Sequence, residues 1–269
     1  MPLSVSCIGY YSQTVSRYSL TEPLTIFLEP KDFRLYEIVI SAKSLVRKRK
    51  SYLRLFKKEF LGTSVNALSC DILNEDDINF DYGSDDTLKV FAMKPILVRN
   101  NALGYLITYY LDKFEYYRNT KSFVYKGNII FEEDLPDGNQ ARQRAYVECR
   151  KEAYLGSRMH FLRSLWAAKL PRNGFQMSDS MEKIVGYKDI VIQEAGNVQD
   201  ENRQYMKYIS YPLPITIYYD NKASRMTLLN QRVYFNKIGF DLQGIFWEGE
   251  MLKKRVGDAL PYEYDMNSR

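Results

Sequence analysis

The sequence contains a single histidine, His160, and no two cysteines that lie close together. A catalytic zinc site needs about three protein ligands, commonly two or more of them histidine, so the usual zinc hydrolase is excluded. Cys7, Cys70 and Cys149 are odd in number and far apart, which predicts neither a disulfide framework nor a zinc-binding pair. We therefore expect three packed thiols and no metal site.

The chain also lacks long apolar runs and the motifs that bind phosphate or activate a serine. No segment approaches the ~20 apolar residues of a membrane-spanning helix, and the first fifteen residues do not have the pattern of a signal peptide. Neither a phosphate-binding glycine loop nor a G-x-S-x-G turn is present, so we expect no cofactor and no esterase chemistry. The net charge of +5 over 269 residues is too small to indicate a nucleic-acid-binding protein.

Tyrosine is the residue in excess. Twenty-three tyrosines, many in alternating segments such as residues 105–111, favour β-structure, in which the ring packs on a sheet and the hydroxyl stays in water. The alternation from Leu73 to Phe131 predicts antiparallel strands, with turns at residues 81–86 and 99–104. The predicted fold class is therefore α+β and β-rich.

A helical period replaces the strand pattern between residues 43 and 62. Tyr52, Phe56 and Phe60 share one stripe with Leu45 and Leu53, and Gly62 is a natural stop. The opposite face is strongly basic. The candidate surface-binding residues on it are Arg47, Lys48, Arg49, Lys50, Arg54, Lys57 and Lys58. These cations predict either a solvated face or a docking surface for anionic lipid or an acidic partner.

A second helical segment is expected over residues 139–170, with Gly156 as a candidate break and Pro171 as the stop. Its apolar spacing predicts one core-facing stripe made of Tyr146, Tyr154, Phe161, Leu162, Leu165 and Trp166. Short strands follow it, including a hairpin expected to turn across residues 229–231. Trp166 in the helical segment and Trp247 near the end are candidate aromatic ligand contacts, although a place in the core is the commoner role of tryptophan.

The opening segments VSCIGYYSQTV (5–15) and EPLTIFLEPKDFRLYEIVISA (22–42) resemble the closing half of the carboxypeptidase regulatory-like β-sandwich, which often precedes TonB-dependent transporters and other Gram-negative envelope proteins. FLGTSVNALSCDILNEDDINFDY (60–82), LGYLITYYLDKFEY (103–116), AYLGSRMHFLRSL (153–165) and GDALPYEY (257–264) resemble, in that order, segments of envelope proteins that carry this regulatory domain.

The resemblance implies three regions: half of a β-sandwich at 1–42, a basic linker helix at 43–62, and a β-rich domain at 63–269 with a helical insertion near 139–170. It implies a place in the periplasm or at the outer membrane, with the signal peptide lost together with the missing strands of the sandwich. The sequence taken literally would instead stay in the cytoplasm. No chemistry comes with the resemblance.

Three functions remain open. The first, which we favour, is a non-enzymatic envelope protein with a structural or binding role, whose partner is an anionic membrane surface or another envelope protein. The second is a hydrolase that uses the carboxylates of residues 75–77 and 132–134, which are otherwise solvated loop charges. The third is a basic adaptor that binds nucleic acid through residues 43–58. We predict no catalytic residue and a structural role for His160.

Overall fold

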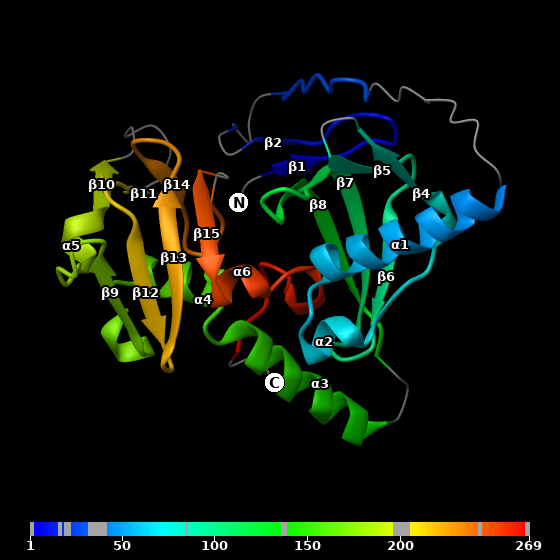
Figure 1. The fold of residues 1–269 in the computed structure, drawn as a ribbon. Helices are drawn as coiled ribbons and strands as arrows, with labels where there is room; N and C mark the ends of the chain where they lie inside the picture. Colours follow the sequence, from blue (N-terminus) through cyan, green and yellow to red (C-terminus); the bar gives the residue numbers. More distant parts are fainter. Residues whose placement is uncertain are drawn as a thin grey trace. The chain divides into compact units, whose positions relative to one another are not determined.

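The computed structural model describes residues 3–15, 18, 23–31, 42–83, 86–135, 139–195, 205–241 and 244–266. The chain divides into two compact units, residues 1–146 and residues 147–269. Figure 1 shows β-sheets in both units, and every strand pair in the described ranges is antiparallel. The α+β, β-rich class predicted from the sequence is confirmed.

A six-stranded antiparallel sheet forms the centre of the first unit. Its strands are β3 (Cys70–Ile72), β4 (Ile78–Tyr82), β5 (Thr87–Ala92), β6 (Ile96–Asn100), β7 (Tyr105–Tyr117) and β8 (Ser122–Glu133). β8 pairs with one edge of β7 along its length, whereas β6 and β5 pair in turn with the other edge. β5 and β6 do not pair with each other, because they pair with different stretches of β7, residues 115–117 and 105–109.

Helix α1 (Ala42–Leu61) packs its aromatic stripe on this sheet. Phe56 and Phe60 are fully buried, and their rings meet Phe114 and Tyr109 edge-on at 4.9 Å. Gly62 follows the helix with a φ of 103°, which a residue with a side chain would adopt at a cost. The helix therefore belongs to the first unit, so the division differs from the boundaries expected at residues 42 and 62. Neither α1 nor any other helix in the described ranges has the length and apolarity that a membrane span requires.

A β-bulge at Asp112 interrupts the register between β7 and β8. The buried Asp112 carboxylate accepts hydrogen bonds from the Ser12 backbone N–H, at 3.0 Å, and from the Ser12 hydroxyl, and it pairs with Lys31 at 3.2 Å. The Lys31 ammonium also donates to the Leu111 carbonyl oxygen at 2.7 Å. The N-terminal segment thus clamps the bulge.

The N-terminal segment itself contains β1 (Leu3–Val5) and β2 (Gln13–Val15), which pair as a two-stranded sheet, and an isolated bridge between Tyr10 and Pro30. Residues 23–31 otherwise form no strand. The rest of the segment 22–42, which the resemblance assigned to the half β-sandwich, lies almost entirely in residues 32–41, outside the described residues.

Two sheets form the second unit, in the orders β15-β13-β12-β9 and β10-β11-β14. Their strands are β9 (Phe175–Asp179), β10 (Val191–Ala195), β11 (Tyr205–Ile209), β12 (Ile215–Tyr219), β13 (Lys222–Leu228), β14 (Val233–Phe235) and β15 (Ile245–Gly249). Helix α4 (Arg158–Trp166) contributes Phe161 and Leu165 to their core, where Phe175, Ile217 and Trp247 are also buried. The short helices are α2 (Val65–Leu68) in the first unit and α5 (Tyr187–Ile190) and α6 (Glu250–Lys253) in the second.

The helical segment expected over residues 139–170 is broken at Gly156. Helix α3 (Gln140–Tyr154) ends there, where Gly156 has a φ of 68°, and the Ser157 hydroxyl caps α4 by accepting from the His160 backbone N–H at 3.1 Å. Tyr146, from the same predicted stripe, belongs to the first unit and packs against Gly104.

The hairpin predicted across residues 229–231 is wrong. β13 pairs with β12 and β15, whereas β14 pairs with β11. The tight hairpin instead joins β12 to β13 through Asp220 and Asn221, whose φ angles are 47° and 57°. Two consecutive positive φ angles are typical of a type I′ turn, which matches the twist of the flanking strands.

Candidate anion-binding surface

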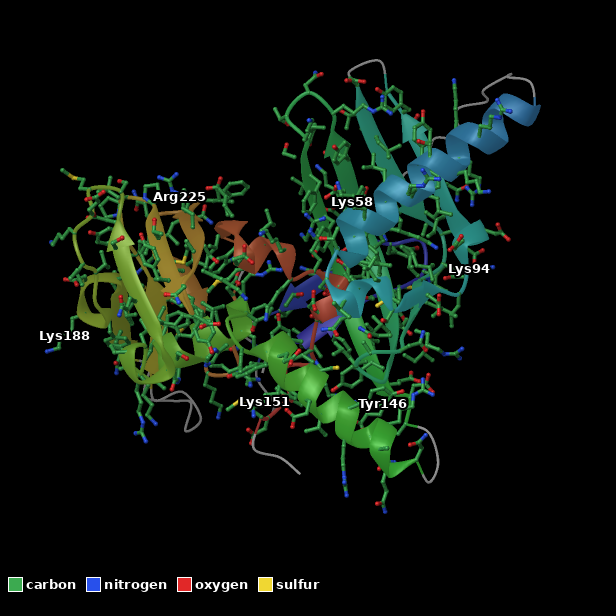
Figure 2. The ribbon with its side chains drawn as sticks, turned by 60° about the horizontal axis from the view of Figure 1, so that its bottom comes forward. Lys58, Lys94, Tyr146, Lys151, Lys188 and Arg225 are labelled. Atoms are coloured by element: carbon green, nitrogen blue, oxygen red, sulfur yellow. The ribbon has the colours of Figure 1, made fainter. Side chains whose placement is uncertain are left out.

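A depression of about 460 Å³ lies between α1 and the turn that joins β7 to β8 in the first unit. It is lined by Ser51, Arg54, Leu55, Lys58, Tyr116, Arg118 and Lys121. Four of these residues are cationic, and none of the described residues that line it is acidic. Figure 2 labels one of them, Lys58, near the C-terminal end of α1. We call this feature the basic depression.

The residues that α1 contributes to the basic depression share one face of the helix. Ser51, Arg54, Leu55 and Lys58 occur at i, i+3, i+4 and i+7, which places them on one face of α1. The aromatic stripe of Phe56 and Phe60 holds the opposite side of the helix on the sheet, which leaves Ser51, Arg54 and Lys58 exposed and Leu55 partly buried.

The strand half comes from the end of β7 and the turn after it. The Arg118 guanidinium lies 5.1 Å from the centre of the Tyr82 ring, which in turn stacks on Tyr52 at 5.8 Å. Lys121 has a φ of 52°, and its N–H donates to the Arg118 carbonyl oxygen at 3.3 Å. The Tyr82 ring therefore positions the Arg118 guanidinium, and the turn fixes the backbone of Lys121.

The seven cations predicted as a single surface separate into two groups. Arg49 is half-buried: its guanidinium donates to the carbonyl oxygens of Ile78 and Glu75, each at 2.8 Å. Lys57 forms an ion pair with the Glu75 carboxylate. These two residues tie α1 to the 3-10 helix η1 (Glu75–Asp77), so their charges are engaged within the fold.

The other group faces solvent. Arg47, Lys48, Lys50 and Arg54 are exposed, and within the described part of the chain no hydrogen bond or ion pair holds their side chains. Lys58 is exposed as well, although its ammonium lies 3.4 Å from the Glu59 carboxylate. We call Arg47, Lys48, Lys50 and Arg54 the exposed cation row. It shares Arg54 with the basic depression, so the two features form one positive surface.

The two tryptophans lie elsewhere, in the second unit. Trp247 is 5% exposed and meets Phe161 edge-on at 6.1 Å, which places it in the core. Trp166 is partly buried. The Lys207 ammonium donates to the Trp166 carbonyl oxygen at 2.7 Å and lies 4.7 Å from the centre of its ring, while Phe235 packs on it edge-on. A cation of the protein therefore already contacts the Trp166 ring.

His160 is buried among aromatic rings. Its Nδ1 accepts a hydrogen bond from the Gly156 N–H at 3.2 Å, and its ring lies 4.8 Å from both Tyr154 and Phe175. Burial, reinforced by the charges of Lys254 and Arg163, lowers the pKa of His160 to about 4. The imidazole is thus neutral near pH 7, in the packed position expected for a structural histidine.

Of the two acidic clusters, residues 75–77 form η1, whose Glu75 and Asp77 are paired with lysines, whereas Glu132 and Glu133 lie in β8 and not in a loop. Glu75 bonds to Lys57, and Asp134 bonds to Arg99 at 3.1 Å. A hydrogen bond from Lys94 at 3.0 Å, with a second from Asn74, lowers the pKa of Asp77. No group of three or more His, Cys, Asp or Glu side chains suited to a metal ion occurs among the described residues.

Comparisons of the chain with protein-family models, with curated proteins and with solved structures found no match. Sequence reasoning identified the basic helix but missed Tyr116, Arg118 and Lys121, because they lie about sixty residues further along the chain and only the fold brings them to α1. The available signal was a turn, R-N-T-K, between two long strand patterns.

Proposed function

We propose that the chain is a non-enzymatic binding protein of the cell envelope that attaches to an anionic membrane surface through its first unit. The observation that carries this proposal is the positive surface formed by the exposed cation row and the basic depression. The envelope setting, and with it the half β-sandwich, rests on the sequence resemblance alone.

The arrangement of charge suits a surface better than a point ligand. Helix α1 has 20 residues and is therefore about 30 Å long, and the exposed cation row spans about 10 Å in its middle, from Arg47 to Arg54. A basic residue near an anionic bilayer contributes about 1 kcal/mol, so the four residues of the row would contribute about 4 kcal/mol, or roughly a thousandfold in affinity. Attraction of this kind is screened over about 10 Å at moderate salt, so the attachment should weaken as salt rises.

The test is co-sedimentation with vesicles. Zwitterionic vesicles with and without an anionic phospholipid are compared at low and at high ionic strength. The parent protein should sediment only with the anionic vesicles and only at low ionic strength. The variant R47Q/K48Q/K50Q/R54Q should stay in the supernatant. Arg49 and Lys57 are left intact, because their contacts hold α1 on the fold.

A matched control removes the same number of charges from the second unit. Lys169, Arg172, Lys188 and Arg225 are exposed there, and the last two are labelled in Figure 2. The variant K169Q/R172Q/K188Q/R225Q should sediment like the parent. If the two quadruple variants lose the same fraction of binding, or if neither loses any, the positive surface of the first unit is not the attachment site.

A further inference from the structure

We infer that the basic depression is a pocket for the phosphomonoester headgroup of a membrane lipid. This deepens the proposed function and rests on it: the exposed cation row would supply attraction to any negative surface, whereas the depression would select one kind of headgroup.

Cations from two parts of the fold meet at the basic depression. A flat docking face needs cations spread over a plane, but Arg54 and Lys58 from α1 face Arg118 and Lys121 from the end of β7 and its turn across one concavity. The four like charges repel one another, and the Glu59 carboxylate, 3.4 Å from the Lys58 ammonium, offsets part of this repulsion. An anion bound in the depression would relieve that repulsion.

The charges and hydrogen-bond donors of the basic depression suit a phosphomonoester better than a diester. A phosphomonoester carries about −1.5 to −2 charge near pH 7 and three acceptor oxygens, whereas a diester carries only one charge. Two arginines can each offer a planar fork of N–H donors, and two lysines add point charges. The Ser51 hydroxyl lies on the same lining and is a further donor. This donor set exceeds what a diester can use and matches a monoester.

The size of the depression and the fixed position of Arg118 also suit this headgroup. The depression is open to solvent, and its volume of about 460 Å³ has room for a phosphate with part of its glycerol or sugar. Leu55 and Tyr116 provide apolar wall for that part. Arg118 is already placed by its contact with Tyr82, so little ordering of this side chain is needed when the anion binds.

The test compares headgroups at equal surface charge. Vesicles of phosphatidylcholine carry either phosphatidic acid, a monoester, or phosphatidylglycerol, a diester, in amounts that give the same zeta potential. The parent protein should bind the monoester vesicles about tenfold more tightly, since one additional charge-assisted hydrogen bond contributes at least that factor. Soluble glycerol 3-phosphate should displace it more effectively than sulfate at the same ionic strength.

Two double variants remove equal charge inside and outside the basic depression. R118Q/K121N should lose the preference for the monoester while keeping salt-sensitive attachment. R47Q/K48Q should weaken binding to both lipids by the same factor and keep the preference. Asparagine tolerates the positive φ of residue 121, so K121N alone, with an unchanged melting temperature, repeats the test without risk to the turn.

Equal binding of the parent to both lipids, or the same effect from both double variants, would overturn the pocket and leave the proposed function standing. A parent protein that binds glycerol 3-phosphate in solution, loses that binding in R118Q/K121N and ignores both kinds of vesicle would overturn the proposed function and the lipid headgroup together, and would assign the depression to a soluble phosphomonoester.

Discussion

Acid should destabilise the second unit through its one histidine. His160 is 6% exposed, and its pKa of about 4 lies well below the ordinary value of 6.5, first because burial disfavours the imidazolium and then because Lys254 and Arg163 repel it. Between these two pKa values the unfolded chain binds a proton that the folded chain does not. The free energy of unfolding therefore falls as the pH drops through this window, and its full value is present above about 6.5.

The size of the effect follows from the gap between the two pKa values. At about 1.4 kcal/mol per pH unit, the gap corresponds to about 3 kcal/mol, of which about 2 kcal/mol is lost between roughly pH 7 and pH 4.5. The comparison protein is His160→Asn, whose side-chain oxygen can still accept from the Gly156 N–H but does not titrate.

The assay is urea unfolding of both proteins at a series of pH values. Tryptophan fluorescence reports the transition, because Trp166 and Trp247 both lie in the second unit. His160→Asn is expected to be less stable at pH 7, where it loses ring contacts, but its stability should fall by about 2 kcal/mol less on acidification. Carboxylates titrate alike in both proteins, so they cancel in the difference. Parallel pH profiles would refute the buried, neutral histidine.

Three further substitutions test the packing. Asp112→Ala should cost about 3–5 kcal/mol, because Lys31 would remain buried without its carboxylate, and hydrogen exchange of β7 and β8 measures the loss; exchange like the parent's would contradict the clamp. Gly104→Ala should lower the melting temperature, because its Cβ would lie 2.4 Å from the Tyr146 ring at a φ of 65°; an unchanged melting temperature would contradict that contact. Asn221→Gly should keep or raise stability by a few tenths of a kcal/mol in thermal unfolding, since glycine suits a type I′ turn; a clear loss would contradict this turn type.

Helices whose apolar stripe meets a sheet could be predicted from the sequence. The spacing of Phe56 and Phe60 with a glycine after the stripe located α1, because burying two rings on one face dominates the local energetics. The same reasoning joined Tyr146 to Phe161 in one stripe. It could not show that the two rings belong to different units, since a period of 3.6 identifies a buried face but not the partner that buries it.

The missed hairpin has a similar cause. Residues 229–231 do connect two strands, but which strands pair depends on neighbours far away in sequence, and β14 pairs with β11. The correct turn was readable from Asp220 and Asn221, two residues that tolerate positive φ between alternating strands.

For the candidate site, the sequence could identify a basic helix but not the state of each charge. Arg49, Arg54 and Lys57 look equivalent along α1. Only the fold brings the Ile78 carbonyl and the Glu75 carboxylate to two of them and leaves Arg54 exposed. A charged side chain is available to a partner when no nearby group of the protein is paired with it. Such pairing depends on tertiary contacts.

The β-bulge explains how the two halves of the basic depression come to face each other. Before the bulge, the odd-numbered residues of β7, such as Tyr109, face α1. Continued alternation would direct Lys113 and Glu115 at the helix, with their charges facing its buried stripe. The extra residue, Asp112, shifts the alternation by one, so Phe114 meets Phe56 and Tyr116 reaches the depression. Since Ser12 and Lys31 hold Asp112 in place, the geometry of the basic depression depends on a segment that the sequence assigned to a separate domain.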